Sequence, residues 1–185
     1  CDKCVPVCPN DANFTFTPAA KSLPIVKAVR TETGWIWRED GVIPITQKHQ
    51  IANFADFCNE CGNCDIFCPE DGGPYVLKPR FFGSEADWRR FAGHDGFFVR
   101  RDAMLGRIDG RTYRLAVAGV EQEFEGDGFR VRFAPDRPEA ASVLAAADGV
   151  ADIDLTVALL MDLIRRGVLD PGRVNPVGVL AGTTP

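Results

Sequence analysis

The seven cysteines of this 185-residue chain fall into two groups that share one spacing. The longer group has the pattern C-x₂-C-x₂-C-x₃-C-P and comprises Cys58, Cys61, Cys64, Cys68 and Pro69. The shorter group opens the chain and repeats the last part of that pattern with Cys1, Cys4, Cys8 and Pro9. This is the ligand pattern of bacterial-type iron–sulfur clusters. The sequence therefore predicts an electron-transfer protein or a piece of one.

The spacing has a physical reason in the shape of a [4Fe-4S] cube. Three thiolates at i, i+3 and i+6 on one tight loop can reach three corners of a single cube, and Gly62 suits a loop that approaches it closely. The last cysteine of each group precedes a proline, which favours extended backbone, and in two-cluster ferredoxins it binds the other cluster. We therefore predict a cluster one held by Cys8, Cys58, Cys61 and Cys64. Cluster two is predicted to use Cys1, Cys4 and Cys68, with a fourth ligand expected upstream of Cys1.

Two other uses of cysteine fit the spacing less well. Structural zinc sites usually take two C-x₂₋₄-C pairs that a longer loop separates. A disulfide framework belongs to an oxidising compartment and is usual in smaller secreted domains. A zinc-stapled interaction module remains a minor alternative.

Composition bounds the class of protein without deciding its function. Hydrophobic residues make up 45% of the chain and charged residues 25%, as in ordinary globular proteins of one or two domains. The net charge of -5 gives no basis for nucleic-acid binding, and no apolar run reaches the length of a membrane span. The chain lacks an initial Met and starts inside a motif, so we expect a fragment. Unpaired thiolates favour the cytoplasm.

Charge is unevenly distributed around the longer cysteine group. Residues 49–77 contain no Lys or Arg, and acidic residues there are expected to lower a cluster's reduction potential: Asp56, Glu60, Asp65, Glu70 and Asp71. Basic residues follow, and a solvated surface is the commoner explanation, with a docking face for an acidic partner as the alternative. They are Lys78, Arg80, Arg89, Arg90, Arg100, Arg101, Arg107, Arg111 and Arg114.

The pattern of expected strands, turns and helices outside the cysteine groups predicts an α+β fold. Residues 1–95 are predicted to form a two-[4Fe-4S] ferredoxin-like domain with a β insertion at about 20–48, and residues 96–185 a β-rich region with helices. Strands are predicted at 24–30, 35–38, 42–46, 104–108, 112–117 and 129–133, with turns at 38–41, 71–74, 108–111 and 125–128. Helices are predicted after a Ser84 cap, over the Ala-rich stretch 138–147, and over 154–166 with Gly167 as a stop.

No catalytic site can be recognised from the sequence. His49 and His94 lack ligand-like spacing, and each is interpreted as a surface or satisfied histidine. No dinucleotide-binding, P-loop or nucleophile-elbow motif occurs. Whether the chain is itself an enzyme is left open.

Residues 51–75, followed by Lys78-Pro79-Arg80-Phe81-Phe82, go beyond a generic cluster signature. This stretch resembles the C-terminal region of bacterial flavoproteins classed as selenate reductase subunits, which are similar to the glutamate synthase small subunit and to dihydropyrimidine dehydrogenase. The resemblance implies FAD and an NAD(P) site in an upstream region of the same polypeptide. It also implies that the clusters connect the flavin to a redox partner subunit. The alternative is a stand-alone ferredoxin-type carrier.

Overall fold

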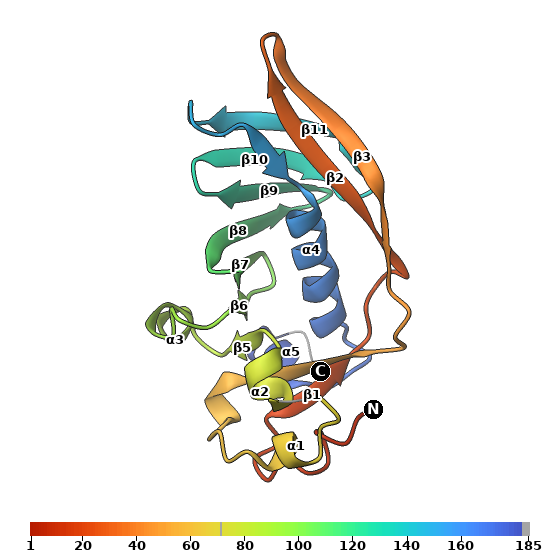
Figure 1. Ribbon diagram of the computed structural model, residues 1–185, viewed down its shortest axis with the longest axis vertical. Helices are drawn as coiled ribbons and strands as arrows, with labels where there is room; N and C mark the ends of the chain where they lie inside the picture. The colour runs from red at the N-terminus through yellow and green to blue at the C-terminus, as the bar shows by residue number, and fades with distance from the viewer. Residues whose placement is uncertain (71, 183–185) are drawn as a thin grey trace.

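The computed structural model describes residues 1–70 and 72–182, and its main element is a nine-stranded sheet. The strands lie in the order β1-β4-β5-β6-β7-β8-β9-β10-β11 (Figure 1). Their bounds are β1 Asn13–Phe16, β4 Gln50–Phe54, β5 Arg80–Phe82, β6 Gly96–Val99, β7 Ala103–Ile108, β8 Arg111–Ala118, β9 Glu121–Gly126, β10 Phe129–Ala134 and β11 Arg137–Ala146. Neighbours pair antiparallel except that β5 runs parallel to both β4 and β6.

A second, three-stranded sheet and five helices complete the described chain. The small sheet has the order β12-β2-β3, with β2 Ser22–Thr31, β3 Gly34–Pro44 and β12 Asp152–Asp154. The helices are α1 Asn63–Ile66, α2 Gly73–Leu77, α3 Glu85–Arg90, α4 Thr156–Val168 and α5 Pro176–Leu180, and a 3-10 turn spans Ala55–Phe57. The described residues are thus mostly β with few helices.

Helix α4 forms the centre of the hydrophobic core. It runs between the large sheet and the β2–β3 ribbon (Figure 1), and its Met161 and Leu159 belong to the same buried cluster as Phe124 and Leu115 of the sheet. The predicted helix at 154–166 is confirmed, with Asp154 Oδ1 accepting a hydrogen bond from the backbone N–H of Thr156 at its start.

The predicted stop at Gly167 is wrong, because α4 continues to Val168. Gly167 instead allows a close approach: a Cβ there would lie 2.8 Å from the Phe16 ring and 2.8 Å from Thr17 O. We expect Gly167→Ala to destabilise the fold by roughly 1–3 kcal/mol through overpacking. Gly149→Ala is the matched control, because a Cβ at Gly149 meets nothing within 4 Å. Urea unfolding of both variants checks this, and equal stabilities would contradict the packing argument.

The local turn signals predict the strands of the second half well. The hairpin at 108–111 and the turn before Phe129 are both present, with positive φ at Asp109, Gly110 and Gly128. Ser84 caps α3 as predicted, since its Oγ accepts from the Asp87 N–H at 3.0 Å.

The helix predicted at 138–147 is wrong, because this stretch is strand β11. Its alanines favour a helix only weakly, and pairing with β10 along its length outweighs that preference. Pro138 and Ala141 face inward and are buried.

The turn predicted at 38–41 is also wrong, because β3 continues through it. Pro24 pairs with Val42 and Val26 with Glu39, so Asp40 and Gly41 together face Ile25 in a β-bulge. Gly41 has a φ of 107°, which glycine adopts readily.

Two of the arginines interpreted as surface residues are buried. Arg80 and Arg107 are each 6% exposed. Arg107 donates to the carbonyl oxygens of Trp88, Phe91 and His94, and its guanidinium lies 4.5 Å from the Trp88 ring centre. These two residues therefore belong to the internal structure.

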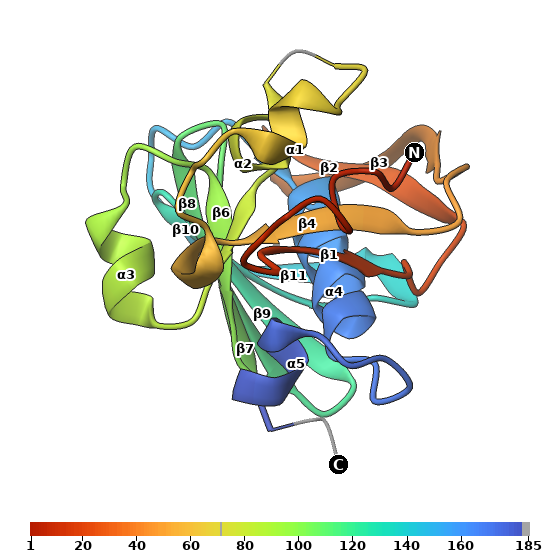
Figure 2. The ribbon, with the colours of Figure 1, turned by 90° about the horizontal axis from the view of Figure 1, so that it is seen from below.

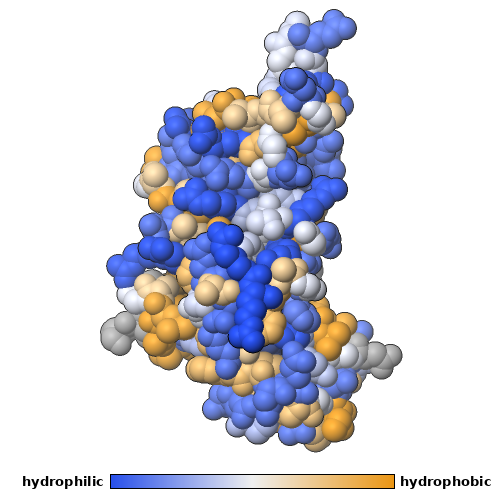
Figure 3. Space-filling view, turned by 90° about the vertical axis from the view of Figure 1, so that its left-hand side faces the viewer, coloured by the Kyte–Doolittle hydropathy of each residue, from blue (hydrophilic) through white to orange (hydrophobic). Residues whose placement is uncertain are grey.

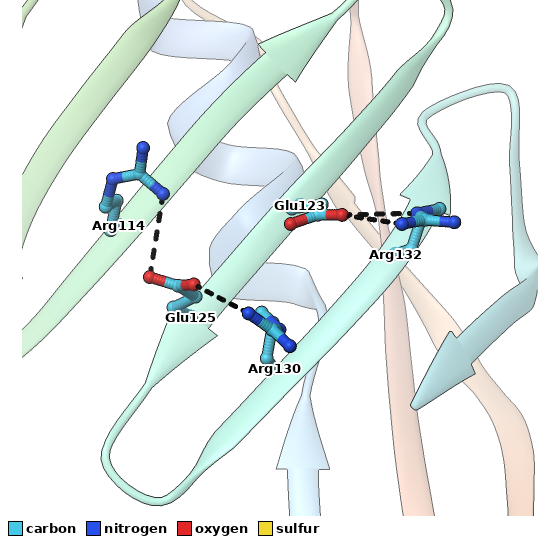
Figure 4. A network of polar contacts seen from close by, with 5 residues as sticks. All are labelled: Arg114, Glu123, Glu125, Arg130 and Arg132. Atoms are coloured by element: carbon cyan, nitrogen blue, oxygen red, sulfur yellow. Dashed lines mark hydrogen bonds and ion pairs between the residues drawn. The ribbon is translucent and has the colours of Figure 1, made fainter. Parts of the chain in front are cut away.

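Other arginines form a ladder of ion pairs on the outer face of the sheet. Glu123 accepts from Arg132, while Glu125 lies within ion-pair distance of both Arg114 and Arg130 (Figure 4). The pairs stand across neighbouring strands, where opposite charges stabilise a sheet modestly. The side of the molecule shown in Figure 3 is mainly hydrophilic, with scattered apolar patches.

The predicted domain boundary at 95/96 falls between two strands of the same sheet. Arg80 on β5 pairs with Gly96 on β6, so the sheet is continuous there. The α+β assignment and the division into 1–95 and 96–185 stay predictions. Among the described helices, none has the length and apolar character needed to cross a bilayer.

Candidate iron–sulfur site

The cysteines lie at one end of the large sheet, on two loops that β1 and β4 bring together. The N-terminal loop leads into β1, and the loop carrying Cys58 to Cys68 leaves β4 through the 3-10 turn. Because β1 and β4 pair antiparallel, with Asn13 opposite Asn53, the two loops emerge side by side (Figures 1 and 2). Glu60 and Gly62 have φ of 55° and 80°, which folds the second loop tightly.

Four cysteines line one hollow, which we call the cluster-one hollow. Three come from the second loop and Cys8 comes from the first, together with polar residues of β1 and β4. Its lining includes Cys8, Cys58, Cys61, Cys64, Asn13, Asn53, Glu60 and Tyr75. The backbone N–H of Ala12 already donates to Cys8 Sγ at 3.3 Å.

The other three cysteines line a neighbouring hollow, the cluster-two hollow. Cys1 and Cys4 come from the first loop and Cys68 from the second. His49 Nε2 forms a 2.7 Å hydrogen bond with Asp2 Oδ1 at this hollow, and this bond lowers the pKa of Asp2. Exposed Lys48, Lys78 and Glu70 also line it.

Electrostatic coupling joins sulfurs both within each hollow and between the two hollows. Burial raises the pKa of the Cys4 thiol, and nearby Cys64 and Cys68 raise it further. Burial likewise raises the pKa of Cys64; a hydrogen bond from Asn13 opposes this rise, while Cys58 and Cys8 reinforce it. Iron must therefore displace protons from thiols that hold them more firmly than free cysteine does.

The donor set fits iron–sulfur clusters. Thiolates are the ligands that hold such clusters, and each hollow gathers thiols from both loops. Within residues 1–70 and 72–182, no three His, Cys, Asp or Glu side chains are placed to hold a single metal ion. The fit thus rests on the thiols of each hollow. The individual ligand roles stay a prediction.

Acidic residues near the second loop mostly stabilise its shape. Glu60 binds Arg80 at 2.8 Å, Asp65 Oδ1 accepts from the Gly72 N–H, and Asp56 Oδ1 accepts from the Gly83 N–H. Glu70 borders the cluster-two hollow, and Asp71 lies outside the described residues. The hydrogen bonds of Asp56, Glu60 and Asp65 could not be read from the sequence, and the effect of the acidic residues on the reduction potential stays a prediction.

Three buried residues beside the hollows were not assigned to the site from the sequence: Asn13, Asn53 and Arg80. No ligand motif includes them. A partial signal was available, because Asn13 and Asn53 each directly precede an aromatic residue in the short stretches that form β1 and β4.

The first part of the chain is similar to a known family. Residues 1–71 match the family described as "4Fe-4S dicluster domain". An iron–sulfur region with two clusters is therefore what the first part of the chain resembles, by sequence and by the arrangement of its thiols.

The chain is also similar to an oxidoreductase. It is 28% identical over 117 residues to the protein named "Putative oxidoreductase YgfK" of Escherichia coli (strain K12), and equally to its counterpart in Escherichia coli O157:H7. The match covers 63% of this chain and 9% of each relative's length. No solved structure matches the chain. These matches support an iron–sulfur, oxidoreductase-related electron-transfer region.

Proposed function

We propose that this chain carries electrons through two [4Fe-4S] clusters as part of a larger FAD- and NAD(P)-dependent oxidoreductase of the selenate reductase type. The observation that carries the proposal is the pair of adjacent hollows, each lined by cysteines from both loops. The name of the two relatives supports an oxidoreductase, and their greater length leaves room for a flavin region.

In this proposal, Cys8, Cys58, Cys61 and Cys64 hold cluster one, and Cys1, Cys4 and Cys68 hold cluster two. The clusters would supply one-electron chemistry. The protein's own residues fix the thiols, exclude water from Cys4 and Cys64, which are buried, and direct backbone and side-chain donors at the sulfurs. The upstream flavin region and the redox partner subunit are parts of the proposal.

Anaerobic reconstitution with iron and sulfide tests this function. We expect a brown protein whose broad visible absorbance bleaches with dithionite. A colourless protein with stoichiometric zinc would instead support the interaction module. Activity distinguishes a stand-alone carrier from this proposal. Such a carrier would exchange electrons as a free protein without any flavin region.

The same preparation tests the ligand count. Expressed with Cys1 as its first residue, the chain offers four cysteines to cluster one and three to cluster two. We expect one stable four-iron cluster and one labile or three-iron cluster, because a cube with three protein thiolates loses an iron readily. Iron and sulfide analysis with EPR measures this. Two equally stable four-iron signals would refute the ligand assignment.

A further inference from the structure

A row of buried polar side chains crosses three neighbouring strands beneath the cysteine loops. Asn13 on β1 pairs with Asn53 on β4, and Asn53 pairs with Arg80 on β5. Their exposed fractions are 3%, 0% and 6%. The next row along the same strands is apolar, with Phe54 opposite Phe81. Burying a polar row inside such strands is unfavourable unless its members are bonded to specific partners.

The row directs its donors to both cysteine loops. Asn13 Nδ2 donates to Cys4 O at 2.9 Å, and Asn53 Nδ2 donates to Asn13 Oδ1 at 2.9 Å. Arg80 donates from Nε to Tyr75 O at 2.9 Å and from Nη1 to Glu60 Oε1 at 2.8 Å. Asn13, Asn53, Glu60 and Tyr75 all line the cluster-one hollow.

The row is incompletely satisfied. Within the described residues, Asn53 Oδ1 is buried and makes no hydrogen bond. An unbonded buried oxygen costs stability, and because this oxygen is an acceptor, only the donors of the row and the Arg80 cation can stabilise added negative charge.

We propose that the row formed by Asn13, Asn53 and Arg80 raises the reduction potential of cluster one above that of cluster two. This inference rests on the proposed function. Reduction adds negative charge to a cluster, and a nearby buried cation and amide N–H dipoles stabilise that charge.

Charges around the two hollows differ in their exposure to water. The Arg80 side chain is 7% exposed, while its partner Glu60 is 52% exposed, so water screens the carboxylate more than the guanidinium. At the cluster-two hollow the charged neighbours Asp2, Lys48, Glu70 and Lys78 are all exposed. Their influence is correspondingly weak. An electron shared between the clusters therefore resides mainly on cluster one.

Arg80→Met tests this in the full chain reconstituted with iron and sulfide. EPR-monitored redox titration is expected to show a lower midpoint potential for cluster one and an unchanged one for cluster two. Arg107→Met is the matched control, because Arg107 is equally buried at 6% exposure and donates to three carbonyl oxygens away from both hollows. It is expected to lower thermal stability and leave both potentials unchanged.

Asn53→Leu provides a second variant if Arg80→Met does not assemble cluster one. It removes the amide while keeping a similar volume, and the potential of cluster one is expected to fall again. The two midpoints are assigned by repeating each titration with Cys1→Ser, which should remove the cluster-two signal. Unchanged potentials in both row variants, or equal shifts at the two clusters, would overturn the inference. A wild-type protein that takes up no cluster would instead refute the proposed function.

Discussion

Replacing Cys8 with serine is expected to abolish cluster one and leave the cluster-two signal in place. Cys8 belongs by sequence to the N-terminal loop, yet its thiol lines the hollow formed by Cys58, Cys61 and Cys64. The reciprocal variant, Cys68→Ser, is expected to abolish cluster two and retain cluster one, because Cys68 lines the hollow with Cys1 and Cys4. Each variant should lose roughly one cluster's iron, measured by iron analysis and EPR.

This crossed pattern of losses distinguishes clusters whose ligands come from both loops from clusters that each belong to one loop. If each loop held its own cluster, Cys8→Ser would damage the cluster of Cys1 and Cys4 instead. A control is available in Ser84→Ala, because Ser84 caps α3 and lines neither hollow. That variant is expected to keep both clusters at a cost of about 0.5–2 kcal/mol in stability.

Replacing Phe124 with alanine is expected to destabilise the protein by about 3–5 kcal/mol, the range for deleting a large buried aromatic side chain. Phe124 on β9 is 0% exposed, and its ring centre lies 5.4 Å from that of Tyr113, on which it stacks, and 5.5 Å from that of Phe129. The cavity left on its inner side would face α4. Denaturant unfolding of the reconstituted protein measures the change.

Val120→Ala is the matched control for Phe124→Ala. Val120 lies between β8 and β9, close in sequence, and is 84% exposed. Its truncation is expected to change the unfolding free energy by less than about 0.5 kcal/mol. If Phe124→Ala lowers the unfolding free energy by no more than Val120→Ala does, the sheet does not pack on α4 as described.

Features that depend on local chemistry were predictable from the sequence. The hairpin at Asp109 and Gly110, the Ser84 cap and helix α4 all follow from short patterns whose geometry is set within a few residues. The cysteine spacing belongs to the same kind of signal. It identified the iron–sulfur class that the comparison of residues 1–71 supports.

Features that depend on distant partners were not predictable. The stretch Arg137–Ala146 has a helical composition, and only pairing with β10 makes it a strand. Gly167 lies close to Phe16, 151 positions earlier (167 minus 16), so its packing role is invisible in any local window. The same holds for the polar row, since pairing of β1, β4 and β5 alone aligns its members.

Strand β12 has a consequence for the order in which the molecule is assembled. It completes the small sheet by pairing Asp152–Asp154 with Val29–Lys27, and α4 follows it directly to pack near Phe16. Strands β1 and β2 therefore gain this cover only when residues 152–168 have folded against them, and contacts so far apart in sequence form slowly. The cysteine loops adjoin β1 and β4, so their final arrangement depends on packing that residues 152–168 complete.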